Sequence, residues 1–164
     1  MRKIVAACLP LLALVAVVGS SQARTVAQDD GCLVVAAGRG IVSLNAKGFL
    51  LGRFDQGTID IEDPLENDGN VRVFGYDKKR FLSDTKTRYI GSFVRYRASG
   101  LFKVHIEALG IDFSLAGKGT ATISSDGFLD AGRYSTDAQS FCETRFQPIP
   151  DLPHKVVISE QTAS

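Results

Sequence analysis

Three parts of this chain have residue types that could do chemistry, and the first is an acidic run. Between Asp55 and Asn70 there are six carboxylates and no basic residue: Asp55, Asp60, Glu62, Asp63, Glu66 and Asp68. The loop at the end of the run is rich in the oxygen ligands that calcium prefers, so Asp63, Glu66 and Asp68 are candidate calcium ligands. Their spacing does not match an EF-hand loop, and a turn started by Pro64 explains the same composition. We therefore predict no metal and no cofactor.

The next segment carries the opposite charge. It holds eight cations against Asp77 and Asp84: Lys78, Lys79, Arg80, Lys86, Arg88, Arg95, Arg97 and Lys103. If these cations share a face, the molecule is dipolar and could dock on an anionic surface or on its own acidic loop. The alternative is that outward strand positions are charged for solubility and to discourage edge pairing.

His105 is the third part, a candidate general acid or base. No Gly-x-Ser-x-Gly motif or comparable nucleophile signature accompanies it, so we predict a surface histidine and no catalytic residue. Two carboxylates of the acidic run could flank a glycosidic bond, but the chain has no tryptophan to stack on a sugar.

The N-terminus predicts export. Arg2 and Lys3 precede a 15-residue apolar stretch, residues 4–18, and small residues then lead to a cleavage site after Ala23. The stretch is short for a membrane span, and no second one follows, so we predict no transmembrane segment after removal of a signal peptide over residues 1–23. Cys8 lies in a sequence like a lipoprotein box, but most of the apolar stretch follows it, which favours plain secretion.

Two cysteines, Cys32 and Cys142, remain in the mature chain. In an oxidising compartment such a pair predicts a disulfide bond; a metal pair or a catalytic thiol would need histidines, and only His105 and His154 are present. Without Arg2 and Lys3, the 19 basic residues become 17 against 18 acidic ones. A nearly neutral chain gives no support for a nucleic-acid partner.

Further along the chain the hydrophobic pattern has a period of two, and turn signals separate the alternating segments. This pattern predicts a single all-β domain over residues 31–146, an antiparallel β-sandwich or small β-barrel. A flexible polar segment, 24–30, precedes it, and an extended, proline-containing tail, 147–164, follows. In the segment 93–107 we expect a hairpin around Ser99-Gly100-Leu101, with Val94, Tyr96, Ala98, Phe102, Val104 and Ile106 facing inward.

One glycine pattern occurs twice. Gly38-Arg39-Gly40, Ser43-Leu44 and Gly48-Phe49-Leu50 return as Gly117-Lys118-Gly119, Thr122-Ile123 and Gly127-Phe128-Leu129. We interpret this as one hairpin made twice, the two copies related by a pseudo-twofold axis, with glycines at bends or close approaches.

Gly38-Arg39-Gly40, Gly57-Thr58-Ile59-Asp60-Ile61 and the stretch 110–119 resemble a family of uncharacterised secreted bacterial β-rich proteins. The resemblance implies no activity and no site residue. We expect a secreted, non-catalytic binding or structural surface protein with a protein or cell-surface partner. The alternatives are a lipocalin-like carrier of a small apolar ligand, which needs an interior cavity, and a hydrolase of unfamiliar type.

Overall fold

The structure, a computed structural model, describes residues 31–65, 68–128, 130–136, 142 and 145–159. The predicted signal peptide, the segment 24–30 and Glu66 lie outside these residues. The strands are β1 (Gly31–Glu62), β2 (Arg72–Phe74), β3 (Lys78–Phe81), β4 (Lys86–Ser125), β5 (Arg133–Ser135), β6 (Gln147–Pro148) and β7 (His154–Ile158). Where the chain is described, no helix is long and apolar enough to cross a membrane.

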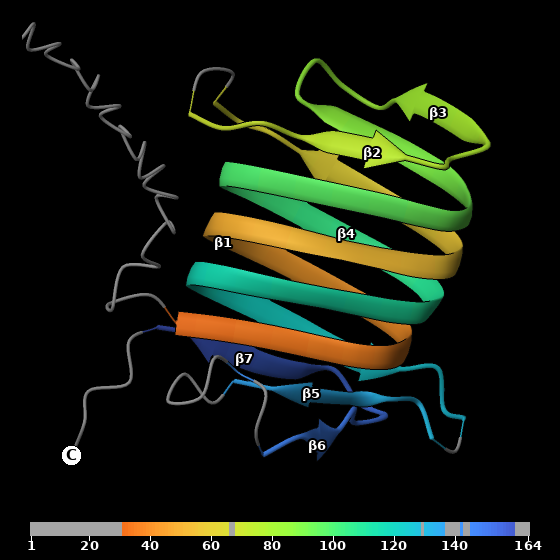
Figure 1. Cartoon of the computed structure of the whole chain (residues 1–164), viewed down its shortest axis with the longest axis vertical. Helices are drawn as coiled ribbons and strands as arrows, with labels where there is room; N and C mark the ends of the chain where they lie inside the picture. Colours follow the sequence, from red (N-terminus) through yellow and green to blue (C-terminus); the bar gives the residue numbers. More distant parts are fainter. Residues whose placement is uncertain (1–30, 66–67, 129, 137–141, 143–144, 160–164) are drawn as a thin grey trace, which may run out of the picture.

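Two very long strands build most of the molecule by winding around each other as a coil (Figure 1). They run antiparallel, and most of β1 pairs with one turn of β4 on each side: Leu44, for example, lies opposite both Val104 and Ala121. The short strands extend the two ends, β2 and β3 at one and β5, β6 and β7 at the other. The predicted antiparallel all-β fold is confirmed.

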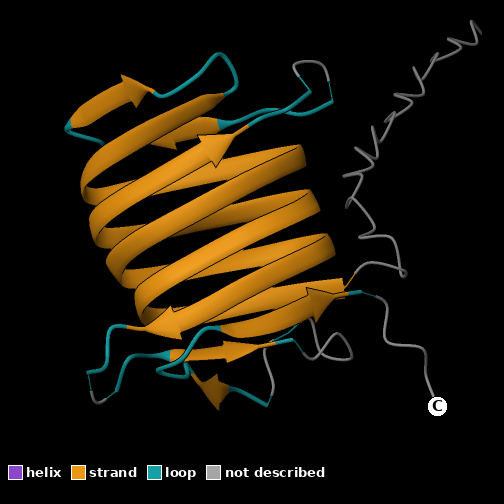
Figure 2. Cartoon of the chain, turned by 180° about the vertical axis from the view of Figure 1, so that it is seen from behind, coloured by secondary structure: helices purple, strands orange, loops and turns teal. Residues whose placement is uncertain are grey.

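The coil is flattened into two layers. The sheet is therefore sandwich-like and does not close into a barrel. The front layer of Figure 1 contains β2, residues 94–99, 49–54, 112–116 and 31–35, then β5 and β6, in that order. The back layer, which faces the viewer in Figure 2, contains β3, residues 86–92, 56–62, 103–109, 40–46 and 119–125, then β7.

The strands turn from one layer to the other at two kinds of corner. On one side Gly48 and Gly117 lie opposite each other with φ near +150°, and a Cβ on either would overlap a carbonyl oxygen of the neighbouring strand. Only glycine fits such a close approach. On the other side Ala37 (φ 52°) and Phe93 (φ 57°) adopt the left-handed conformation, and the register of β1 against β4 slips at a bulge next to Ala37.

The core fills the space between the layers. Alternate residues of both long strands point inward and form one continuous cluster, with Phe54, Phe102 and Tyr96 among its largest fully buried side chains. All six residues of 93–107 that we expected to face inward are buried. Burial of side chains this large contributes about 1.5–3 kcal/mol each, so the core is the main source of stability.

The expected turn at Ser99-Gly100-Leu101 is wrong, because β4 runs through it without reversing. Gly100 lies at a corner of the coil, opposite Gly48. A glycine next to serine is typical of a tight turn, but here it serves a bend into the other layer.

The repeated glycine pattern has a structural basis over part of its length only. Gly40 and Gly119 lie in adjacent antiparallel turns, both with positive φ, and a Cβ on each would overlap the carbonyl oxygen of the equivalent neighbour, Ser124 or Asn45. The equivalence covers residues 40–46 and 119–125, which pair with each other about Ser43 and Thr122. It does not extend to the next matched glycines, because Gly48 lies inside β1, whereas Gly127 follows the end of β4. The interpretation as a repeated hairpin is therefore wrong.

The domain continues past residue 146, where we predicted its end. Strand β7 pairs with β4 and buries Val156 and Ile158, and β6 pairs with β5. Pro148 lies in the short strand β6, at the end of the sheet, where a missing N–H is tolerated. The two cysteines lie at disulfide distance, as predicted, with their Cα atoms 6.0 Å apart.

Candidate functional site

The acidic run and part of the basic run meet on the back layer and neutralise each other. Asp60 lies opposite Arg88, whose Nε and Nη2 donate to its two carboxylate oxygens at 2.6 and 2.8 Å. Lys86 approaches the same carboxylate at 3.5 Å, and Lys103 binds Glu62 at 2.8 Å. The coil therefore brings two runs that are separate in sequence into a ladder of ion pairs.

Asp60 is the buried member of this ladder, with a side chain only 4% exposed. The hydrogen bonds from Arg88 hold the pKa of the Asp60 carboxyl below its ordinary value, although burial acts in the opposite direction. The pair stabilises the sheet and leaves no free carboxylate at this position for a ligand.

Four arginines lie together on the front layer, two of them from the basic run, whereas the basic residues of β3 lie on the back layer. We call Arg53, Arg72, Arg95 and Arg97 the arginine cluster. Arg72 pairs in register with Arg97, and Arg53 pairs in register with Arg95, so each arginine faces another one across a strand boundary. All four side chains point outward and are exposed.

The positive charge of the arginine cluster is largely uncompensated. Asp112 binds Arg53 through Oδ2 at 2.9 and 3.0 Å, and Arg72 donates to the neutral Asn70 at 3.3 Å. Within the described ranges, neither Arg95 nor Arg97 has a carboxylate within ion-pair distance. Among the described residues, the four guanidinium groups of the cluster therefore have one carboxylate partner, Asp112, which binds Arg53.

The sequence alone predicts two of the four arginines of this cluster. Arg95 and Arg97 belong to the basic run and occupy the outward positions that the alternation predicted. Arg53 and Arg72 lie outside the run, and only the pairing of β1 and β2 with β4 brings them in. Because these pairings join distant segments, no local signal could have identified them.

The calcium candidates do not form a common site among the residues that the structure describes. Asp68 accepts a hydrogen bond from the backbone N–H of Leu101 at 2.9 Å, which ties its loop to β4. Asp63 is described and Glu66 is not. In the described part of the chain, no group of three acidic, histidine or cysteine side chains could hold a metal ion.

His105 lies on the outer surface of the back layer, half-buried, with its Nδ1 2.9 Å from the hydroxyl of Ser43. Asp60 lies opposite it on the next turn of β1, but both carboxylate oxygens bind Arg88. Asp60 is therefore not available to orient the imidazole of His105. This arrangement favours a polar contact between Ser43 and His105 on the sheet surface over a nucleophile with its base.

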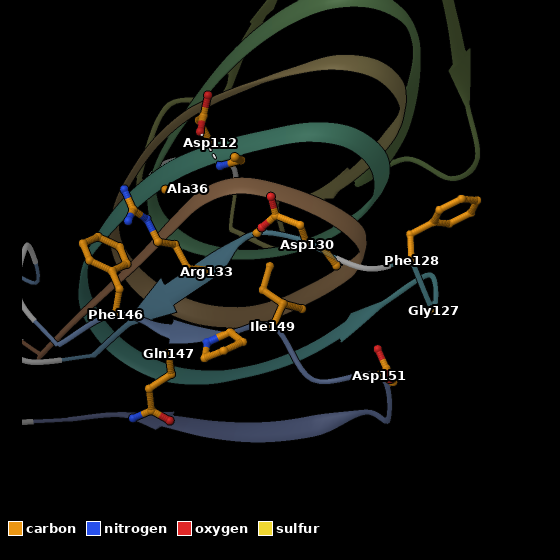
Figure 3. Close-up of a pocket in the computed structure, with 14 residues that line it drawn as sticks. Ala36, Asp112, Gly127, Phe128, Asp130, Arg133, Phe146, Gln147, Ile149 and Asp151 are labelled. Atoms are coloured by element: carbon orange, nitrogen blue, oxygen red, sulfur yellow. Dashed lines mark hydrogen bonds between the residues drawn. The ribbon is translucent and has the colours of Figure 1, made fainter.

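A pocket with a volume of about 910 Å³ opens at the lower end of the coil, beside β5 and β6 (Figure 3). Two carboxylates that line it are used by the fold: Asp112 accepts from the N–H of Ala37 at 2.8 Å, and Asp151 accepts from the hydroxyl of Ser125 at 2.6 Å. The pocket is open and lined by polar residues as well as apolar ones. It does not have the enclosed apolar interior that a lipocalin-like carrier requires.

Comparisons of this chain with protein-family models, with curated proteins and with solved structures find no match. The resemblance to secreted bacterial β-rich proteins stays a prediction.

Proposed function

We propose that this chain is a non-catalytic binding protein that is exported from the cell and holds an anionic ligand on its arginine cluster. The observation that carries this proposal is the register: Arg72 opposite Arg97, and Arg53 opposite Arg95. Like charges directly opposite each other on a sheet are destabilising. A face that keeps two such pairs gains stability when an anion binds between them.

The residue type supports the same function. An arginine guanidinium binds phosphate or carboxylate through two parallel hydrogen bonds, which gives affinity as well as a defined geometry. On the back layer, by contrast, Lys86, Arg88 and Lys103 are each matched by a carboxylate of the same molecule. The contrast between these paired cations and the arginine cluster supports a binding role for the cluster.

The sequence supports export. The N-terminal segment has the three regions of a signal peptide, and the cysteine pair at disulfide distance is typical of proteins that function in an oxidising compartment.

The test is binding of a soluble polyanion, linear polyphosphate, to the full mature chain by calorimetric titration at low and high salt. We expect binding that weakens as salt is added, because the contacts are ionic and exposed. The double change Arg95→Ser and Arg97→Ser should weaken it at least about tenfold, since charged hydrogen bonds are lost.

The matched control is Lys78→Ser with Lys155→Ser. It removes the same charge from exposed positions on β3 and β7, outside the cluster. Equal weakening in both double variants would show an effect of net charge alone and would contradict the proposal, as would polyphosphate binding that the arginine changes leave intact.

A further inference from the structure

The arginine cluster is interleaved with exposed apolar side chains. Leu51, 54% exposed, lies opposite Arg97, and Phe74, 54% exposed, lies opposite Arg95. Phe49, 44% exposed, is the next outward residue of β1 on the same layer. Exposed apolar residues scattered over a surface need no explanation, but a group of them among uncompensated cations is a feature of an interaction site.

Phe93 extends this apolar group at the corner where β4 enters the front layer. Its side chain is 75% exposed, and its backbone has φ 57°, a conformation that is unusual for a bulky residue. The corner thus holds a large apolar side chain out in solvent, two residues before Arg95 on the same strand.

The shape of this face limits its partner. Outward side chains of a sheet stand in a grid, about 5 Å apart across the strands and about 7 Å apart along them. None of the four arginines lines the end pocket or either of two smaller pockets, with volumes of about 270 and 440 Å³. The face therefore suits a broad, flat anionic partner better than a compact ion.

We infer that the front layer docks on the surface of an anionic phospholipid bilayer. The arginines bind lipid phosphate groups, and Leu51, Phe74 and Phe93 enter the boundary between head groups and acyl chains. Basic residues next to a membrane are attracted to anionic lipids, and aromatic side chains are favoured at the interface. This inference rests on the proposed function and names its ligand.

The experiment is sedimentation of the full mature chain with vesicles of phosphatidylcholine alone or of phosphatidylcholine and phosphatidylglycerol in equal parts. We expect binding to the anionic vesicles only. Arg95→Ser with Arg97→Ser should lower it about fivefold for each arginine removed. Phe74→Ser with Phe93→Ser should also lower it, while leaving polyphosphate binding unchanged.

The matched control is Phe81→Ser with Leu152→Ser, which removes two apolar side chains that are 75% and 79% exposed elsewhere on the molecule. It should bind anionic vesicles as the unchanged protein does. Urea unfolding of each variant verifies that the fold is retained, and all the altered side chains are exposed.

Three results would overturn the inference and leave the proposed function standing. The first is polyphosphate binding without binding to anionic vesicles, and the second is vesicle binding that Phe74→Ser with Phe93→Ser does not alter. Equal loss in the Phe81 and Leu152 control would also overturn it, because the effect would then be general hydrophobicity. Polyphosphate binding that survives the arginine changes would overturn the proposed function itself.

Discussion

At the scale of single residues, Arg88 and Arg97 show how one side-chain type serves two purposes on the same strand. Arg88 binds a carboxylate that is almost fully buried, Asp60, whereas Arg97 faces Arg72. When a buried polar group loses its partner, its desolvation is no longer compensated, and the folded state is destabilised by that amount. Removing one of two facing cations relieves repulsion instead.

We therefore predict opposite effects for Arg88→Thr and Arg97→Thr, two identical changes on β4. Arg88→Thr should lower the free energy of unfolding by about 1–3 kcal/mol, because Asp60 loses its main partner. Arg97→Thr should leave it unchanged or raise it by about 0.2–1 kcal/mol at low salt. Urea unfolding at low and high salt measures both, and a clear loss of stability in Arg97→Thr would show that the arginine has a structural partner.

The effect of Arg88→Thr should also depend on pH. The pKa of Asp60 is lower in the folded state than the ordinary 3.8, so its contribution is fully present above that pH. It is lost as the pH falls through the lower, folded pKa. The difference in stability between the variant and the unchanged protein should therefore shrink in acid below pH 3.8, and a constant difference there would contradict the role given to Asp60.

At the scale of elements, the corners of the coil decide whether the two long strands can form. Gly48 combines a φ of 156° with a close approach to the carbonyl of Ala116, while Gly127, with φ 81°, has open space where a Cβ would stand. Both positions strain a residue with a side chain, and only the first also produces a collision inside the sheet.

Gly48→Ala should therefore destabilise the protein by about 3 kcal/mol or more, and Gly127→Ala by about 1–2 kcal/mol. The two variants form a matched pair, since each adds one methyl group at a positive φ. Thermal or urea unfolding measures the difference, and equal losses would show that the backbone conformation matters and the close approach does not.

The same corners explain how far the sequence could predict the fold. Alternation is a local property, so the inward side chains from Val94 to Ile106 were identified correctly. The sequence predicts a turn at Gly100, because a glycine in a hairpin and a glycine in a corner of the coil have the same local sequence pattern. The difference depends on Gly48 lying opposite, and that pairing joins segments far apart in the chain. For the same reason, the sequence does not predict that Arg53 and Arg72 belong to the arginine cluster.

At the scale of the whole molecule, the coil has almost no local pairing. The nearest partners on the two long strands are Glu62 and Lys86, and the farthest are Gly31 and Gly117. Chains with such distant contacts close large loops before they gain stabilising interactions, and they fold slowly. The cysteine pair, 110 residues apart, ties together the two ends of this topology.

Reduction of the bond between Cys32 and Cys142 should therefore have a large effect on stability. A crosslink that closes a loop of this length lowers the entropy of the unfolded chain and stabilises the fold by about 4–5 kcal/mol as an upper value. We expect the urea midpoint to fall strongly when a reductant is added, while the double variant Cys32→Ser with Cys142→Ser unfolds at the lower midpoint with or without it.

Because Cys142 is fully buried, reduction should be slow in the folded state and fast once urea opens the lower end of the coil. A midpoint that a reductant leaves unchanged after complete reduction would show that the coil holds its ends together by packing alone.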